Sequence, residues 1–335
     1  MLRDTLGREI KDLRISVTDR CNFRCTYCMP FDHYEWIERK EILSYEEIVR
    51  IAALFIRLGV EKIRLTGGEP LMRRDLHLLV SRLSPLPGLL DLCLTTNGAL
   101  LAKAAPELAR AGLKRVNVSL DTLDEARFRQ LSGRAGLSKV LEGLFAARDC
   151  GLAPIKINAV IQRGINDDEI VELTEFARSN GFSIRFIEFM DVGTVNEWTA
   201  EKMVPKTEIL EKVKSSIPLL EAVAERGSAP AVNYRFADGD GDVGVIASVT
   251  EPFCGNCTRI RITADGKLVT CLFSDRGENL NSLLRGGADD EELSRFISSI
   301  WERRADRYSE LRTEILKAGN DAASRKKIEM IRLGG

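Results

Sequence analysis

The sequence predicts an α/β protein with a parallel sheet, open or curled into a barrel, followed by a smaller C-terminal domain. From residue 12 to about residue 190, short β-rich runs alternate with amphipathic helical stretches, as in strands joined by helical crossovers. Polar and glycine-rich turns follow these runs. Residues 227–244, rich in Gly, Asp, Ala and Pro, then indicate a loop or domain boundary. We therefore expect one domain over residues 1–226 and another over residues 227–335.

Six β-rich runs define the expected strands. They are Leu13–Val17, Lys62–Thr66, Leu92–Thr96, Arg115–Leu120, Ile155–Ile161 and Ile184–Phe189. The amphipathic helical segments between them include residues 44–58, 100–111 and 166–180. In the last of these, Asn166 is followed by three acidic residues, which predicts a helix cap and a first turn favoured by the helix dipole.

The composition is that of an ordinary globular protein and excludes several function classes. Of the 335 residues, 44% are hydrophobic and 30% are charged, and the formal net charge is −1. A chain with this balance has no global field that attracts nucleic acid or an anionic membrane. No apolar run approaches the roughly 18 residues of a membrane-spanning helix. The charged start lacks the apolar core of a signal peptide, so we expect a cytoplasmic protein.

Three cysteines, Cys21, Cys25 and Cys28, form the pattern C-x₃-C-x₂-C. Clustered cysteines in a cytoplasmic protein favour metal or cofactor ligation over disulfides. A structural zinc site needs four ligands, and no fourth candidate lies nearby. Three thiolates suit a four-iron cluster that keeps one iron open for a substrate or cofactor, because an electron carrier normally has every iron capped.

A second group, Cys254, Cys257 and Cys271, has the spacing C-x₂-C-x₁₃-C. From the spacing alone it could hold zinc with an undetected fourth ligand, an auxiliary electron-relay cluster, or a cluster with an open iron. The other cysteines, Cys93 and Cys150, fall in a strand and at a helix end, where small buried apolar residues are expected. Three ligands therefore favour a second open iron, free for substrate.

Polar and glycine residues cluster where the predicted strands end. They are T-G-G-E-P at 66–70, T-T-N-G at 95–98, S-L-D at 119–121 and E-F-M-D at 188–191. In barrels of parallel strands the active site lies at this end, and the first cysteine group also follows a strand. Adjacent Gly67 and Gly68 allow the backbone to approach a ligand closely. We therefore expect these features on one face.

Several basic residues lie on strands that should be buried. They are Arg14, Lys62, Arg64, Lys156 and Arg185, and Arg259 and Arg261 directly follow the second cysteine pair. The last two alternate with isoleucines, so they share one face of a strand. Buried charge needs a partner. The set therefore predicts a substrate with several negative charges, such as a triphosphate.

These motifs resemble the radical S-adenosylmethionine (SAM) superfamily and, within it, the GTP 3′,8-cyclase family. The resemblance is carried by D-L-R-I-S-V-T-D-R-C-N-F-R-C-T-Y-C-M-P, I-R-L-T-G-G-E-P-L-M-R, V-I-Q-R-G-I-N-D-D-E, R-F-I-E-F-M-D-V-G and C-G-N-C-T-R-I-R. It covers essentially the whole chain. It implies an incomplete (β/α)₆ TIM-like barrel of the radical SAM type, with a C-terminal iron–sulfur domain closing the open side.

The resemblance also implies the reaction and its cofactors. GTP would be converted to (8S)-3′,8-cyclo-7,8-dihydroguanosine 5′-triphosphate, the first step of molybdenum cofactor biosynthesis. Each cysteine group would hold a 4Fe-4S cluster, and SAM would bind the open iron of the first. The 5′-deoxyadenosyl radical made from SAM would abstract the 3′ hydrogen of the ribose.

The same resemblance assigns roles to individual residues. SAM contacts are expected from Tyr27, Gly68, Ser119 and Met190. GTP contacts are expected from Arg14, Lys62, Arg64, Thr95, Lys156, Arg185, Arg259 and Arg261. Arg259 and Arg261 are also expected to act in the reaction itself, because the region has no histidine. The terminal Gly334 and Gly335 are expected to thread toward the active site, where a side chain would clash.

The implied partners are GTP and an electron donor such as flavodoxin or ferredoxin. Product hand-off to cyclic pyranopterin monophosphate synthase and a homodimer are further expectations, with no nucleic acid and no membrane. Two alternatives stay open. A peptide-modifying radical SAM maturase would usually carry more cysteines, and a non-catalytic iron–sulfur or zinc protein should close its metal sites.

Overall fold

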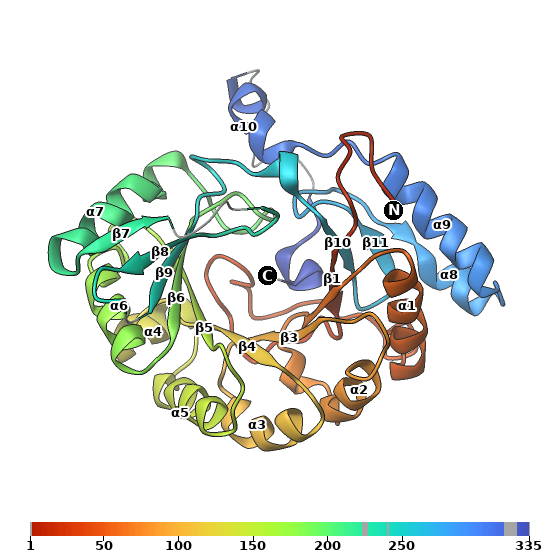
Figure 1. The fold of residues 1–335 in the computed structure, drawn as a ribbon, viewed down its shortest axis with the longest axis horizontal. Helices are drawn as coiled ribbons and strands as arrows, with labels where there is room; N and C mark the ends of the chain where they lie inside the picture. The colour runs from red at the N-terminus through yellow and green to blue at the C-terminus, as the bar shows by residue number, and fades with distance from the viewer. Residues whose placement is uncertain (1, 223–226, 240, 318–326, 335) are drawn as a thin grey trace.

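The computed structural model describes residues 2–222, 227–239, 241–317 and 327–334, and a twelve-stranded sheet forms its centre. The strand order is β12-β11-β10-β1-β2-β3-β4-β5-β6-β9-β8-β7. The six middle strands follow one another along the chain and are all parallel. They are β1 Asp12–Ser16, β2 Lys62–Thr66, β3 Asp91–Thr96, β4 Arg115–Ser119, β5 Lys156–Ile161 and β6 Ser183–Glu188. Figure 1 shows them curving into an open ring, so the expected incomplete (β/α)₆ barrel is confirmed.

Most helices cover the outside of this ring, as Figure 1 shows. The helices are α1 Tyr45–Arg57, α2 Leu76–Leu83, α3 Leu101–Arg110, α4 Glu125–Ser132, α5 Leu137–Asp149, α6 Ile170–Ser179, α7 Lys206–Ser216, α8 Leu280–Arg285, α9 Asp290–Glu302, α10 Tyr308–Lys317 and α11 Met330–Leu333. Short 3₁₀ turns lie at Pro70–Met72, Ala200–Lys202 and Cys254–Asn256. Within the described ranges, no helix combines the length and apolar character that crossing a membrane requires.

The C-terminal strands extend the sheet at both of its edges. Strand β9 (Asp242–Ile246) runs parallel to β6, and β10 (Arg259–Ile262) runs parallel to β1. Antiparallel strands complete the edges, β7 Leu219–Ala222 and β8 Val232–Phe236 on one side, β11 Lys267–Val269 and β12 Glu278–Asn279 on the other. The loop expected over residues 227–244 is therefore largely a hairpin, because short β-forming runs flank its glycines.

The predicted strands agree with the observed ones to within one residue at each end. Helix α1 also begins as its sequence indicates, with Ser44 and Glu47 forming a capping box. The predicted cap at Asn166 is wrong, because α6 begins at Ile170. Asn166 instead holds the preceding turn, donating to the carbonyl oxygens of Asp121 at 2.8 Å and Val160 at 3.0 Å.

Alternation along the strands separates an apolar outer face from a charged interior. Leu13 and Ile15 of β1, like Ile63 and Leu65 of β2, are buried in the core under the helices. The residues between them, Arg14 and Arg64, face the inside of the ring, because successive side chains of a strand point to opposite faces. The barrel therefore encloses a cavity that charged side chains face, rather than a packed apolar centre.

Three buried glutamates tie together the loops at the carboxyl ends of the strands. Glu69, after β2, accepts from the Thr96 hydroxyl and the Asn97 amide, both at 2.7 Å. The other two act in the same way. Glu169 accepts from Thr122 and Leu123, and Glu188 accepts from the amides of Lys206, Val249 and Thr250. Each carboxylate thereby fixes one loop against its neighbour around the mouth of the barrel.

Candidate functional site

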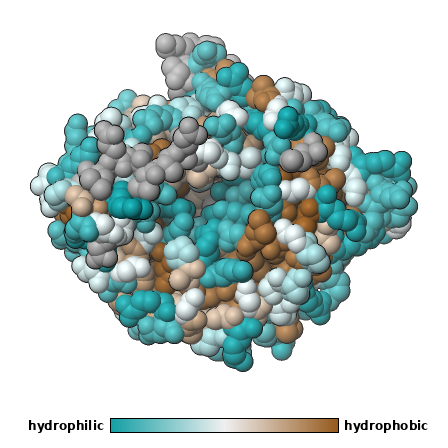
Figure 2. Space-filling view, in the orientation of Figure 1, coloured by the Kyte–Doolittle hydropathy of each residue, from teal (hydrophilic) through white to brown (hydrophobic). Residues whose placement is uncertain are grey.

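One cavity inside the barrel, lined in part by the loops that follow the strands, contains nearly every residue that the sequence singles out. Both cysteine groups line it, together with the predicted SAM contacts Tyr27, Gly68, Ser119 and Met190. The GTP-assigned residues Arg14, Arg64, Thr95, Arg185, Arg259 and Arg261 also line it. In Figure 2, the face of the molecule in view is hollowed near its centre, and hydrophilic residues cover much of the rim of the hollow. The turns that follow the strands and the first cysteine group thus lie at the carboxyl ends of the strands, as expected. Cys254 and Cys257 instead directly precede β10, which runs parallel to β1, so they lie toward the amino ends.

The first cysteine group lies in the loop after β1. The Cys28 and Met29 amides both donate to the Cys25 carbonyl oxygen, at 3.0 and 2.8 Å, which fixes the turn between the cysteines. Burial raises the pKa of Cys21 to about 11 and that of Cys28 to about 12. Such thiols would stay protonated at neutral pH, whereas ligands must be thiolates. A bound cluster would therefore have to supply the positive charge that stabilises these side chains as thiolates.

The residues assigned to SAM surround this loop. The Tyr27 hydroxyl donates to Asp121 at 2.6 Å, and burial raises the pKa of Asp121 to about 6 against the effect of that bond. The Gly68 amide donates to the Thr18 carbonyl oxygen at 2.8 Å. A Cβ atom on Gly68 would collide with the backbone of Arg20, so only glycine fits here. These contacts hold the T-G-G-E-P segment against the first cysteine loop.

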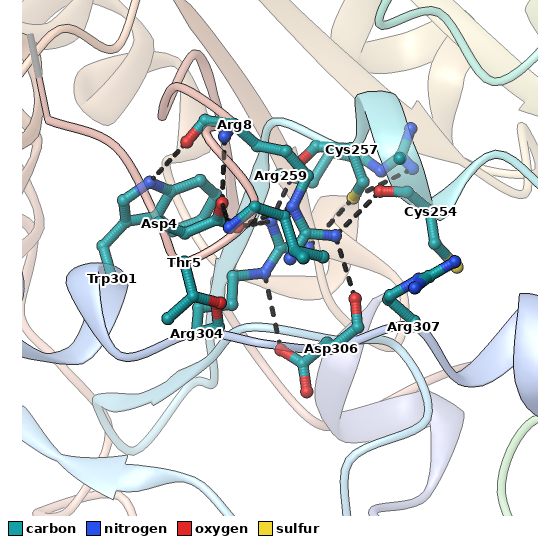
Figure 3. A network of polar contacts seen from close by, with 12 residues as sticks. Asp4, Thr5, Arg8, Cys254, Cys257, Arg259, Trp301, Arg304, Asp306 and Arg307 are labelled. Atoms are coloured by element: carbon teal, nitrogen blue, oxygen red, sulfur yellow. Dashed lines mark hydrogen bonds and ion pairs between the residues drawn. The ribbon is translucent and has the colours of Figure 1, made fainter.

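The second cysteine group lies beside two guanidinium groups, as Figure 3 shows. Arg259 and Arg304 donate to the Cys257 Sγ at 3.1 and 3.2 Å, and Arg304 also donates to the Cys257 carbonyl oxygen at 2.8 Å. Burial alone would raise the pKa of Cys257, but these two positive charges lower it to about 6. The Cys257 side chain is therefore prepared to ligate as a thiolate.

The N-terminal segment packs against this arginine and cysteine cluster through Asp4 and Arg8 (Figure 3). Asp4 pairs with Arg8 at 2.6 Å and with Arg304 at 3.3 Å, and all three side chains are almost completely buried. Arg8 reaches the carbonyl oxygens of Cys254 at 2.7 Å and Asp306 at 2.9 Å. The chain start thus braces both ends of the loop that carries Cys254 and Cys257.

A site for a single metal ion needs at least three ligands close together, unlike the site of an iron–sulfur cluster. In the parts of the chain that the structure describes, no three His, Cys, Asp or Glu side chains stand close enough to share one metal ion. An iron–sulfur cluster binds its cysteines through different irons, so it does not require such convergence.

Five arginines converge on the interior of the cavity: Arg14, Arg64, Arg185, Arg259 and Arg261. The Nε atoms of Arg14, Arg64 and Arg261 are buried and find no hydrogen-bond partner among the described residues. Burial, followed by the charge of Arg259, lowers the pKa of Arg261 to about 10. Buried donors without partners and mutual repulsion indicate a site for an anion.

Lys62 and Lys156 also lie on inward-facing strand positions, but they do not line the cavity. Lys62 lies between Asp12 at 3.8 Å and Asp91 at 3.7 Å, near the amino ends of the strands. Lys156 precedes Asn158, which does line the cavity, by two positions on β5. Both lysines thus form a deeper layer of charge beneath the arginines.

The end of the chain lies at the centre of the ring in Figure 1. Gly334 has φ +68°, and a Cβ atom there would collide with the side chain of Thr66. Gly335 lies outside the described residues. The structure thus explains a glycine at position 334 by a close approach to β2.

Two residues of this site escape sequence reasoning. Arg304 follows Cys257 at a distance of 47 positions, after an ordinary amphipathic helix, so no local pattern marks it. Arg115, buried on β4, pairs with Asp91 at 2.6 Å below the cavity. Arg14 and Arg64 are predicted because they are basic residues on buried strands, and the same reasoning applies to Arg115.

Comparison with known families divides the chain into two matched regions. Residues 15–177 match the radical SAM superfamily, and residues 182–310 match the family described as Molybdenum Cofactor Synthesis C.

Several curated relatives are similar over nearly the full length of the chain. A GTP 3′,8-cyclase of Acidothermus cellulolyticus is 52% identical over 93% of this chain and 88% of its own. GTP 3′,8-cyclases of Xanthomonas axonopodis pv. citri and Staphylococcus aureus are 43% and 44% identical, each over 100% of this chain and 99% of their own.

Solved structures show the same fold at low identity. Streptococcus suis SuiB bound to S-adenosylmethionine superposes with a TM-score of 0.61 at 18% identity, over 86% of this chain and 68% of that one. The anSMEcpe structure with bound AdoMet gives 0.53 at 15% identity, over 78% and 74% of the two chains.

We predict that Arg304→Met selectively weakens iron retention by the second cysteine group. Removing a group that orients a metal ligand typically costs about 10- to 100-fold in metal affinity. After anaerobic reconstitution and challenge with a chelator, the variant should lose iron toward the content of one cluster. Arg303→Met is the matched control, because the exposed Arg303 pairs with Glu278 rather than with either cysteine loop. Equal retention in both variants, or equal loss from both clusters, would contradict the role of Arg304.

Proposed function

Because the chain belongs to the GTP 3′,8-cyclase family of radical SAM enzymes, we propose that its charged cavity binds GTP by the triphosphate. The enzyme converts GTP to (8S)-3′,8-cyclo-7,8-dihydroguanosine 5′-triphosphate, the first step of molybdenum cofactor biosynthesis. It uses SAM and two 4Fe-4S clusters. The observation that carries the proposal is the set of five inward-facing arginines, four of which keep a buried donor unpaired among the described residues.

The arginine set suits a triphosphate in both number and chemistry. Guanidinium groups bind phosphate oxygens through paired charge-assisted hydrogen bonds. Arg14 and Arg64 are register partners on β1 and β2, and Arg14 and Arg261 are partners on β1 and β10. These three side chains therefore approach a ligand from adjacent strands. A polyanion among them would relieve their mutual repulsion and satisfy their unpaired donors.

The cysteine groups would hold the clusters on opposite sides of this anion site. We assign Cys21, Cys25 and Cys28 to the first cluster, and Cys254, Cys257 and Cys271 to the second. When bound, the first cluster supplies the electron that cleaves SAM to a 5′-deoxyadenosyl radical. Tyr27, Gly68, Ser119 and Met190 would orient SAM, so that its 5′ carbon faces the ribose of GTP.

Further residues keep the nucleotide in place during the reaction. Thr95 lines the cavity, and its buried Oγ1 finds no partner among the described residues, so it can bond to the substrate. Arg259 and Arg261 flank the second cysteine group and the anion site, where they would hold the guanosine and order the proton source for the reduced product. Lys62, Lys156 and Arg185 would add positive charge beneath and beside the triphosphate. Gly334 and Gly335 would close the site without a side-chain clash.

The organisation and partners complete the proposal. Residues 1–226 would form the radical SAM barrel, and residues 227–335 the part that adds the second cluster and the strands at its edges. We propose a cytoplasmic enzyme, in keeping with the described helices, which cannot span a membrane. An electron donor such as flavodoxin or ferredoxin, hand-off to cyclic pyranopterin monophosphate synthase, and a homodimer complete the expected interactions.

The function is tested by an anaerobic assay of the reconstituted protein with GTP, SAM and dithionite. We expect 5′-deoxyadenosine and the cyclised nucleotide to form together, and both to depend on GTP. If SAM were cleaved at the same rate without GTP, the substrate would be wrong. If a protein with intact clusters cleaved no SAM, the assignment of Cys21, Cys25 and Cys28 would be wrong.

We predict that GTP binding weakens as the pH rises above about 8. Burial, followed by the charges of Arg185 and Arg115, lowers the pKa of Lys156 to about 8. Below that pH the lysine is charged and attracts the triphosphate, whereas above it the charge is lost. A nearby anion favours the charged form, so binding takes up a proton in this range.

The measurement is the dissociation constant of GTP between pH 7.5 and pH 9. We expect it to rise on the order of several-fold in the wild type, the effect of one charge near a polyanion. Lys156→Arg keeps its charge throughout and should show a flat profile. The same slope in both proteins would rule out Lys156 as the group responsible.

A further inference from the structure

The C-terminal segment 327–334 crosses the mouth of the barrel and is attached on both sides. On one side, the Ile328 amide donates to the Ser274 carbonyl oxygen at 3.0 Å. On the other, the Ser16 hydroxyl of β1 donates to the Arg332 carbonyl oxygen at 2.9 Å, and Gly334 lies against Thr66 of β2. Figure 1 shows α11 inside the ring of strands rather than outside it.

One buried carboxylate anchors the start of this segment. Asp191, in the loop after β6, accepts from Lys327 Nζ at 2.9 Å and from Arg312 Nε at 2.8 Å. Lys327 also donates to the Asp191 carbonyl oxygen at 2.6 Å and to the Tyr308 hydroxyl at 3.1 Å, and Tyr308 itself bonds to Asp191. Asp191, Arg312 and Lys327 are each at most 5% exposed. An ion network buried to this degree has one well-defined geometry.

The same network touches the loop of the second cysteine group. Phe273, two positions after Cys271, stacks on Tyr308 with ring centroids 4.4 Å apart. Arg312 and Lys327 lie over these rings, at 5.1 Å from Phe273 and 4.9 Å from Tyr308. A cation over an aromatic ring gains further attraction when it is desolvated. The anchor thus joins the loop after β6, the Cys271 loop, α10 and the tail.

A second polar attachment follows directly along the tail. Glu329 accepts from the Thr194 hydroxyl and, at 3.4 Å, from the Thr194 amide. Gly193 has φ +71°, which strains any other residue, and a Cβ atom there would lie 2.7 Å from the Glu329 carboxylate and displace it. Met330 next lines the cavity itself. The tail therefore enters the reaction cavity one position after Glu329 and three positions after Lys327, the two residues that fix its start.

We propose that Asp191 and Lys327 are positioning residues that dock the C-terminal tail into the reaction cavity and couple its placement to the Cys271 loop. Neither residue lines the cavity, so each acts through the segment that it holds. With the tail docked, Met330 and Gly334 complete the wall beside Thr66. Without the anchor, that wall is open, and a reactive intermediate is exposed to water and to alternative geometries.

The test compares Lys327→Met with Lys212→Met in the reconstituted protein. Lys212 is a matched control, because it donates to both the carboxylate and the carbonyl oxygen of Asp167, each at 2.8 Å, away from the cavity. Hydrogen exchange is measured at the amides of residues 327–334. We expect exchange there to speed up by about tenfold or more in Lys327→Met, the effect of losing a charge-assisted bond. Asp191→Asn should act in the same way, whereas Lys212→Met should match the wild type.

The second readout is the yield of cyclised nucleotide per 5′-deoxyadenosine formed, which rests on the proposed function. Misplacing a group near the reacting atoms costs up to about 100-fold, so this yield should fall in Lys327→Met and return in Lys327→Arg. Unchanged tail exchange would overturn the proposal, as would exchange that rises throughout the chain or a yield that stays at the wild-type level. If the wild type formed no cyclised product, the proposed function would be wrong. The exchange rates of the tail amides would still test whether Asp191 and Lys327 hold the tail.

Discussion

The structure depends on a concentration of positive charge inside a barrel that has little of its own to balance it. Arg14, Arg64, Arg185, Arg259 and Arg261 face one cavity, and four of the five keep a buried donor that finds no hydrogen-bond partner among the described residues. Charges buried in this way cost free energy unless a partner of opposite sign is bound. A bound polyanion would therefore supply the negative charge that the protein itself does not place in the cavity.

The sheet topology brings this charge and both cysteine groups together. Strand β10 pairs with β1, so Arg259 and Arg261 lie beside Asp12 and Arg14, although each pair is 247 positions apart in the sequence. Cys254 and Cys257 directly precede β10 and therefore lie toward the amino ends of the strands, whereas the first cysteine group follows β1 at their carboxyl ends, around the mouth of the barrel. Buried glutamates at the strand ends, such as Glu69 and Glu188, then hold the loops around that mouth in place. A continuous sheet thus positions two metal-binding loops against one anion site.

Much of this could be predicted from the sequence, because the signals are local. The strands of the barrel, the capping box at Ser44, the cysteine spacings and the arginines on strands all occur within short stretches. What could not be predicted depends on pairing between distant segments. No periodicity or residue spacing in the sequence indicates that β9 pairs with β6 and β10 with β1. The same is true of the contact between Arg304 and Cys257 and of the Asp191–Lys327 pair. The error at Asn166 has the same origin, since its side chain bonds to the neighbouring loop at Asp121 rather than to its own helix.

The central claim is that phosphate charge, rather than the guanine base, balances the barrel. The most direct measurement is the thermal stability of the reconstituted protein with saturating GTP, GMP or guanosine. A ligand stabilises the folded protein in proportion to the logarithm of its concentration over its dissociation constant. We predict a midpoint shift that is largest with GTP, smaller with GMP and least with guanosine. An equal shift with guanosine and GTP would contradict the account, because it would mean that the arginines contribute nothing to binding.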